Sequence, residues 1–224
     1  MRVRGVYIRG HKYLPDLQVN FQQFDGTESH GTEWVTSILG PNGSGKSIIS
    51  QAIACAFAGS VREEGAPCTV SADLVRVDFE VDNAVIAAQS FRGRFDRHSA
   101  IAARFDSKGK HGVMMYDRNR LAMDVPGNYT GLKVIVPILA DIHLRSLEDS
   151  VVVIDDFDLG LDASLRGKFF KHLRSHLRPR RNQLILTARE KIGEMYEVVL
   201  PEGRDVMEDA MREVSLLGKR PASS

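Results

Sequence analysis

One stretch of the sequence decides the fold, and it reads Gly40-Pro41-Asn42-Gly43-Ser44-Gly45-Lys46-Ser47. It fits the pattern G-x-x-x-x-G-K-[ST] of a phosphate-binding loop. The apolar residues Trp34–Leu39 before it predict a strand, and Lys46–Ala58 after it predict a helix. Glycines let the backbone curl so that its N–H groups face a phosphate, and the helix dipole adds positive potential. The stretch therefore predicts a nucleotide site in which Lys46 neutralises the phosphates and Ser47 ligates Mg²⁺. The alternative is a glycine loop that joins a strand to a helix without a ligand.

A second motif, 108 residues after Ser47, supports the nucleotide site. Val151–Ile154 is a continuous apolar run, typical of a strand buried on both faces of a parallel sheet, and Asp155 and Asp156 follow it directly. Open α/β sheets bind ligands at the carboxyl ends of their strands. We therefore expect Asp155 to hold Mg²⁺ through water and Asp156 to polarise the attacking water. Two solvated acids after a strand are the alternative.

The remaining pattern predicts an α/β fold with a mainly parallel sheet and an antiparallel part. Alternating residues predict strands over Val3–Ile8 and Leu17–Phe21, and the arms Leu74–Val81 and Ala84–Gln89 predict a hairpin about Asp82–Asn83. Two more helices are expected, over Leu132–Leu147 and along the apolar repeat Leu165, Phe169, Leu173 and Leu177. Short strands are expected at Leu184–Leu186 and Val198–Leu200.

The motifs together resemble the ABC-type ATPase superfamily, in its SMC/RecF-like branch of AAA domains. GPNGSGKS has the wording of that branch's Walker A motif. VVVIDDFDLGLD (151–162) is similar to its Walker B motif and D-loop, and VRGVYIRGHKYLPDLQVNF (3–21) looks like its first hairpin. The resemblance implies ATP and Mg²⁺ as ligands and a P-loop NTPase head, with an antiparallel β subdomain and a small helical lobe.

The resemblance also implies a role for each matching residue. Lys46, Gln89 and Asp156 would be catalytic, with Asp156 as the catalytic carboxylate and Gln89 as the Q-loop glutamine. Ser47, Asp155 and Gln89 would contact the metal, while Arg189 stands at the switch-histidine position and would contact the γ-phosphate. The signature motif would survive as Tyr129-Thr130-Gly131, and Asp162 would belong to the D-loop.

The same resemblance implies one head over residues 1–217. Its nucleotide lobe would comprise residues 1–90 and 150–217, its small helical lobe residues 91–149, and residues 218–224 would be a disordered tail. About 40 residues separate Gln89 from Gly131 and contain no heptad run, so we expect a compact head without a coiled coil.

Two departures from the family pattern bear on function. Position 156 carries Asp where the family has Glu, which places the carboxylate about 1 Å farther from the water, and Arg189 cannot shuttle protons as a histidine does. We therefore expect a slow Mg-ATPase whose ATP-driven dimerisation, head to head or with a partner protein, gates a separate nuclease or effector in DNA repair or antiphage defence. The alternatives are a nucleotide sensor with little hydrolysis, a small-molecule kinase whose lid lies in 91–120, and a scaffold with a vestigial site.

Charge excludes some partners and leaves others open. The 224 residues carry a net charge of +1, which excludes a uniformly basic nucleic-acid coat. Residues 163–188 contain no acid but seven bases, namely Arg166, Lys168, Lys171, Arg174, Arg178, Arg180 and Arg181. These basic residues suit a nucleic-acid partner; the alternatives are a solvated helix face or a protein partner. No aromatic residues alternate with them in the way that stacks nucleobases. Without a secretory signal or a membrane-spanning stretch, the chain is expected in the cytoplasm.

Overall fold

The computed structural model describes nine stretches of the chain. They are residues 1–24, 29–32, 34–58, 70–92, 94–95, 112–116, 132–145, 147–193 and 195–201. Both Walker motifs lie within them, whereas Thr130, Gly131 and the tail expected over 218–224 lie outside the described residues.

A parallel sheet forms one layer of the fold. Its strands are β5 (Val35–Leu39), β9 (Val113–Tyr116), β10 (Val151–Ile154), β11 (Gln183–Ala188) and β12 (Tyr196–Val199). The order is β12-β5-β11-β10-β9, and every neighbouring pair is parallel. The carboxyl ends of the strands therefore share one edge, which confirms the expected mainly parallel α/β sheet.

An antiparallel sheet packs above it. It consists of β1 (Arg2–Arg9), β2 (Leu17–Asn20), β6 (Leu74–Val81), β7 (Ala84–Phe91) and β8 (Arg94–Phe95), in the order β2-β1-β6-β7-β8. The hairpin of β6 and β7 turns at Asp82 and Asn83, both at positive φ, as the sequence predicts. A separate pair is formed by β3 (Gln22–Phe24) and β4 (Ser29–Thr32).

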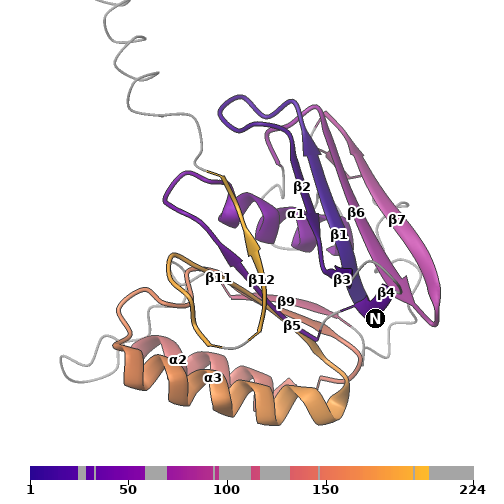
Figure 1. Cartoon of the computed structure of the whole chain (residues 1–224). Coiled ribbons are helices and arrows are strands. Elements are labelled where there is room, and N and C mark those ends of the chain that lie inside the picture. The colour runs from indigo at the N-terminus through magenta and orange to yellow at the C-terminus, as the bar shows by residue number, and fades with distance from the viewer. Residues whose placement is uncertain are drawn as a thin grey trace, which may run out of the picture.

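Within the described stretches, three α-helices complete the layers (Figure 1). α1 (Lys46–Ala58) lies between the two sheets, whereas α2 (Leu132–Arg145) and α3 (Ala163–Leu177) cover the other face of the parallel sheet. A 3₁₀ turn, η2 (Arg178–Arg180), extends α3. The four residues of β10 show why its sequence is apolar throughout: Val151 and Val153 join the core around α1, and Val152 and Ile154 join the core under α2 and α3.

The segment expected as a helical lobe, 91–149, is only partly described. Within it, β9 is an edge strand of the parallel sheet, and Ile138 and Ile142 of α2 pack on that same sheet. These two pieces therefore contribute to the parallel sheet and to the core beneath it. Among the described helices, none combines the length and apolar character that crossing a bilayer needs.

One buried amide ties the two sheets together. The backbone N–H of Val3 in β1 donates to Oε1 of Gln183 in β11 (2.7 Å), and Nε2 of Gln183 donates to the carbonyl of Val3 (3.1 Å). Gln183 is fully buried. These two hydrogen bonds join the sheets at the amino-terminal end of β11, opposite the edge where the phosphate loop begins.

Candidate nucleotide-binding site

The phosphate loop continues directly from β5 at the carboxyl edge of the parallel sheet. The N–H of Gly40 donates to the carbonyl of Ala188 at the end of β11 (3.3 Å). Gly43 and Gly45 adopt φ values of 81° and 99°, a region that side chains disfavour. A Cβ on Gly45 would also lie 2.8 Å from Leu14 in the turn between β1 and β2. The loop thus needs glycine both for its curl and for its contact with the antiparallel sheet.

Lys46 is the first residue of α1, and its side chain turns back into the phosphate loop. Its Nζ donates to the carbonyls of Gly40 and Pro41, both at 2.7 Å, and the residue is 5 % exposed. Burial lowers the pKa of Lys46, and the nearby charge of Asp156 partly offsets this. The ammonium therefore stands at the mouth of the loop, where a phosphate would meet it.

Asp155 follows β10 at the same edge and is 5 % exposed. Its Oδ1 accepts hydrogen bonds from Thr187 Oγ1 (2.5 Å) and from Ser50 Oγ of α1 (3.4 Å). Three elements, β10, β11 and α1, therefore fix one carboxylate beside the loop. Among the described residues no hydrogen bond reaches its Oδ2, so that oxygen is available to a ligand.

Asp156 adopts a left-handed backbone conformation with φ 51°. Its N–H donates to Thr187 Oγ1 (2.8 Å), so Thr187 orients both acids at once. Burial raises the pKa of Asp156, the charge of Asp155 raises it further, and Lys46 works against both. Two adjacent acids and one buried lysine thus lie beside the same loop.

A family model described as an AAA domain matches residues 6–133, more than half of the chain. The chain belongs to this family. Its fold is that of the ABC-type and SMC/RecF-like ATPase heads, as the motifs indicated. No curated protein sequence gives a significant match to the chain.

Solved structures show the same fold for this AAA domain. The SMC head domain from Thermotoga maritima is 21 % identical, with a TM-score of 0.52, over 86 % of this chain and 90 % of that one. CbiO1 from Clostridium perfringens, part of the ABC transporter complex CbiONQ, is 16 % identical with a TM-score of 0.48 over 96 % of each chain. The first of these likenesses supports the fold.

The side-chain oxygen atoms beside the phosphate loop of this AAA domain are of the kind that binds a magnesium ion. Mg²⁺ prefers hard oxygen ligands, usually one or two carboxylates or hydroxyls together with water and phosphate. Ser47 is exposed at the start of α1, and Asp155 faces the loop with a free oxygen. In addition, Ser44 Oγ is buried without a partner among the described residues, as expected of a polar group in a ligand cradle.

Asp158 is a site residue that the sequence reasoning missed. Its Oδ2 accepts from the N–H groups of Arg189 (2.9 Å) and Glu190 (3.3 Å), which joins the segment after β10 to the segment after β11. Arg189 itself is exposed at the carboxyl edge. Asp158 is visible in the sequence as the third acid of DDFD (155–158). Its partners are backbone N–H groups, and a motif of side chains does not predict such bonds.

The structure does not bring Gln89 to the phosphate loop, and it gives Asp162, expected in the D-loop, a local role at the start of α3. Gln89 is exposed in β7 on the outer face of the antiparallel sheet, paired with Arg76, whereas α1 packs against the opposite face. Asp162 caps α3, because its side chain accepts from the N–H of Leu165 (2.9 Å). The sequence spacing located both residues along the chain but did not determine their faces or their local bonds.

Proposed function

We propose that this AAA domain binds Mg-ATP at Gly40–Ser47, hydrolyses it slowly, and uses ATP-driven dimerisation to gate a partner activity. One observation carries the proposal: Lys46, Asp155 and Asp156 converge on the phosphate loop although 109 residues separate Lys46 from Asp155. The raised pKa of Asp156 suits a group that must accept a proton.

In the proposed reaction, Lys46 exchanges the carbonyls of Gly40 and Pro41 for the β- and γ-phosphate oxygens. The backbone N–H groups at the start of α1 have no partner within the helix and bind the phosphates. Asp156 orients the attacking water and takes its proton, while Thr187 holds Asp156 in place. A bound magnesium ion, held by Ser47 and Asp155, would neutralise charge on the phosphates. Arg189 would add a fixed positive charge near the γ-phosphate.

The turn between β1 and β2 offers a place for the nucleotide base. Leu14 of this turn and Leu17 at the start of β2 lie against Gly45, so the turn covers the loop. Tyr13 stands next to Leu14, with the ammonium of Lys12 lying 4.7 Å from the centre of its ring. An aromatic ring with an adjacent cation is suited to stack on a base.

Dimerisation through the carboxyl edge is supported by the surface beside the acids. A cavity of about 400 Å³ opens there between the segment 158–163 and the pair Arg189 and Glu190. Leu159 is 40 % exposed at its rim. An exposed leucine beside a polar hollow is suited to a second head. The output would come from a separate nuclease or effector in DNA repair or antiphage defence, a role carried over from the family resemblance alone.

Phosphate release and molar mass in solution test the proposal together. The wild-type chain should release phosphate from Mg-ATP and gain mass toward a dimer in light scattering. Asp156→Asn should bind ATP and dimerise but release phosphate at least 100-fold more slowly. Asn suits the left-handed conformation at this position, so the variant preserves the backbone.

Two outcomes separate the proposal from its alternatives. ATP-dependent dimerisation without phosphate release in the wild type would identify a nucleotide sensor. Absence of both ATP binding and dimerisation would overturn the proposal.

A further inference from the structure

A second pocket lies at the opposite edge of the parallel sheet, where the strands begin. It encloses about 240 Å³. It is lined by Trp34, Val35, Phe170, Arg174, Arg178, Met195 and Tyr196. Trp34 directly precedes β5, and Tyr196 is the first residue of β12. The phosphate loop follows the other end of β5, so this pocket is separate from the nucleotide site.

The basic residues of α3 and of the η2 turn that extends it divide into two groups. Arg166 pairs with Glu190 (3.3 Å), Arg181 pairs with Asp149, and Arg180 contacts His176 (3.3 Å). The side chains of a second group have no hydrogen bond or ion pair within the part of the chain that the structure describes, and all its members are exposed: Lys168, Lys171, Arg174 and Arg178. At 3.6 residues per turn these four fall within about 120° of the helix circumference and span about 15 Å along it.

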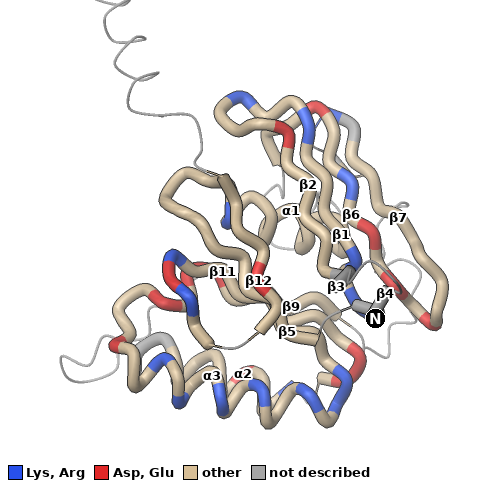
Figure 2. Tube along the Cα trace, in the orientation of Figure 1, with Lys and Arg blue, Asp and Glu red and all other residues tan. Residues whose placement is uncertain are grey.

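These four residues form what we call the α3 stripe. Figure 2 shows the positive charges that run along α3. Since no acid occurs in residues 163–188, nothing on the helix itself neutralises the stripe. Arg174 and Arg178 at one end also line the pocket, so the stripe leads into it. An extended polyanion fits this arrangement.

Aromatic side chains stand at the end of the stripe, contrary to the expectation from the sequence. Trp34 and Tyr196 are distant from α3 along the chain but share the pocket with Arg174 and Arg178. The guanidinium of Arg2 lies 3.7 Å from the centre of the Trp34 ring and holds the indole in place. A fixed indole beside two guanidinium groups is suited to stack a base and bind its phosphates.

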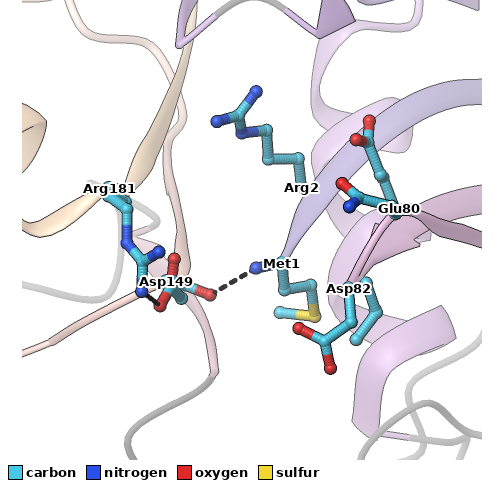
Figure 3. A pocket seen from close by; sticks show the side chains of 8 residues that line it. Met1, Arg2, Glu80, Asp82, Asp149 and Arg181 are labelled. Atoms are coloured by element: carbon cyan, nitrogen blue, oxygen red, sulfur yellow. Dashed lines mark hydrogen bonds and ion pairs between the residues drawn. The ribbon is translucent and has the colours of Figure 1, made fainter.

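The pocket next to it has a different charge balance (Figure 3). Arg2 lines that pocket, together with the acids Glu80, Asp82 and Asp149. There the terminal amine of Met1 donates to the carbonyl of Asp149 (2.9 Å), and Arg181 pairs with the Asp149 carboxylate. The positive groups on that side are matched by acids, so a polyanion is directed to the α3 stripe.

We infer that the α3 stripe and the Trp34 pocket bind single-stranded nucleic acid. One unpaired base stacks against Trp34, Arg174 and Arg178 bind the adjacent phosphates, and Lys168 and Lys171 follow the backbone away from the pocket. A duplex keeps its bases stacked inside and cannot offer one to the indole. This site goes beyond the proposed function, and its occupation requires no ATP.

Fluorescence provides a direct test, because Trp34 is the only tryptophan of the chain. A short oligodeoxythymidylate, added without nucleotide, should quench the tryptophan emission saturably. In fluorescence anisotropy, Trp34→Leu should weaken binding about 10-fold, and Trp34→Phe should retain most of the affinity. The double variant Arg174→Ala/Arg178→Ala should reduce the slope of log K against log salt by about 1.4. Arg145→Ala, which removes an exposed arginine of α2 paired with Asp141, is the matched control and should leave the slope unchanged.

Several results would overturn the inference. They are the absence of binding, binding without quenching of Trp34, or equal quenching by a duplex of the same length. Equal binding by poly-glutamate would reduce the stripe to a general polyanion surface and would also reject the stacking of a base. Quenching is measured on the wild-type chain, so this part of the test does not depend on the folding of a variant.

Discussion

Thr187 at the end of β11 donates a hydrogen bond of 2.5 Å to Oδ1 of Asp155, and the same hydroxyl accepts the N–H of Asp156 at 2.8 Å. One side chain therefore orients the two acids of the Walker B motif. Among the described residues, the Thr187 side chain forms hydrogen bonds with the two acids and with neither the phosphate loop nor Lys46, so it is a positioning residue. Its effect on the reaction must pass through the two acids.

Replacing this hydroxyl should reduce hydrolysis more than nucleotide binding. Thr187→Val keeps the shape of the side chain but leaves the N–H of Asp156 without its acceptor. We expect phosphate release to fall roughly 10- to 100-fold, because misplacement by about 1 Å costs that much. The matched control is Thr36→Val in β5, since Thr36 is buried and its Oγ1 has no partner among the described residues. Equal rates in the two variants would contradict the role of Thr187.

Removing the ammonium of Lys46 should weaken ATP binding without lowering the stability of the fold. Lys46→Met should weaken ATP binding about 100-fold in a titration with a fluorescent nucleotide, because charge-assisted bonds to phosphate are lost. The thermal midpoint should stay the same or rise, because burial disfavours the charged form of Lys46 and lowers its pKa. Lys168→Met on exposed α3 is the control and should change neither quantity. Lower stability in Lys46→Met would show that its bonds to Gly40 and Pro41 outweigh the cost of burial.

The raised pKa of Asp156 predicts how stability depends on pH. Its causes are burial first and the charge of Asp155 second. Because the folded chain holds this proton more tightly than the unfolded chain, the contribution of Asp156 to stability is largest below its unfolded pKa. That contribution is lost as the pH rises through the folded pKa. At neutral pH the ionised carboxylate therefore destabilises the fold.

Thermal melting of Asp156→Asn against the wild type checks this dependence. The variant should melt at the higher temperature at pH 7, and the difference should shrink as the pH falls toward the pKa of a free carboxyl group. Asp158→Asn, at a neighbouring acid that binds backbone N–H groups, should instead lose stability at pH 7. A difference that grows at acid pH for Asp156→Asn would contradict the assignment.

The amide of Gln183 should be among the largest single contributors to stability outside the apolar core. Gln183→Leu leaves the N–H and carbonyl of Val3 buried without these partners, at a cost of about 3 kcal/mol. Urea unfolding should show a lower midpoint. Gln18→Leu, on the exposed face of β2, should leave the midpoint nearly unchanged.

The sequence predicted those elements whose pattern is local. The helix over Lys46–Ala58 has the bounds that its loop and apolar content indicate, and β10 occupies Val151–Ile154 as expected. β9 was missed, because a four-residue edge strand that is half-buried for three of its residues has neither a continuous apolar run nor clean alternation. Pairing with β10 determines the position of β9, and this pairing cannot be seen in the local sequence.

The candidate site divides in the same way. The loop and its two acids were predictable, because each follows directly from a strand that ends at the carboxyl edge. Gln89 was assigned by its distance from Ser47 along the chain, which does not say on which face of β7 the side chain lies. The Trp34 pocket could not be predicted for a related reason: Trp34 and Tyr196 are far from α3 along the chain, and only the sheet brings them to it.

The position of Lys46 also has a kinetic consequence. Its ammonium is already satisfied by two carbonyls of its own loop, at 2.7 Å each. An arriving phosphate must therefore compete with an internal ligand, and binding is an exchange of partners at one cation. The release of products runs the same exchange backwards, with the carbonyls of Gly40 and Pro41 recapturing the ammonium. The two carbonyls therefore compete with bound phosphate for the ammonium, and this competition favours release of the products over permanent occupation of the loop.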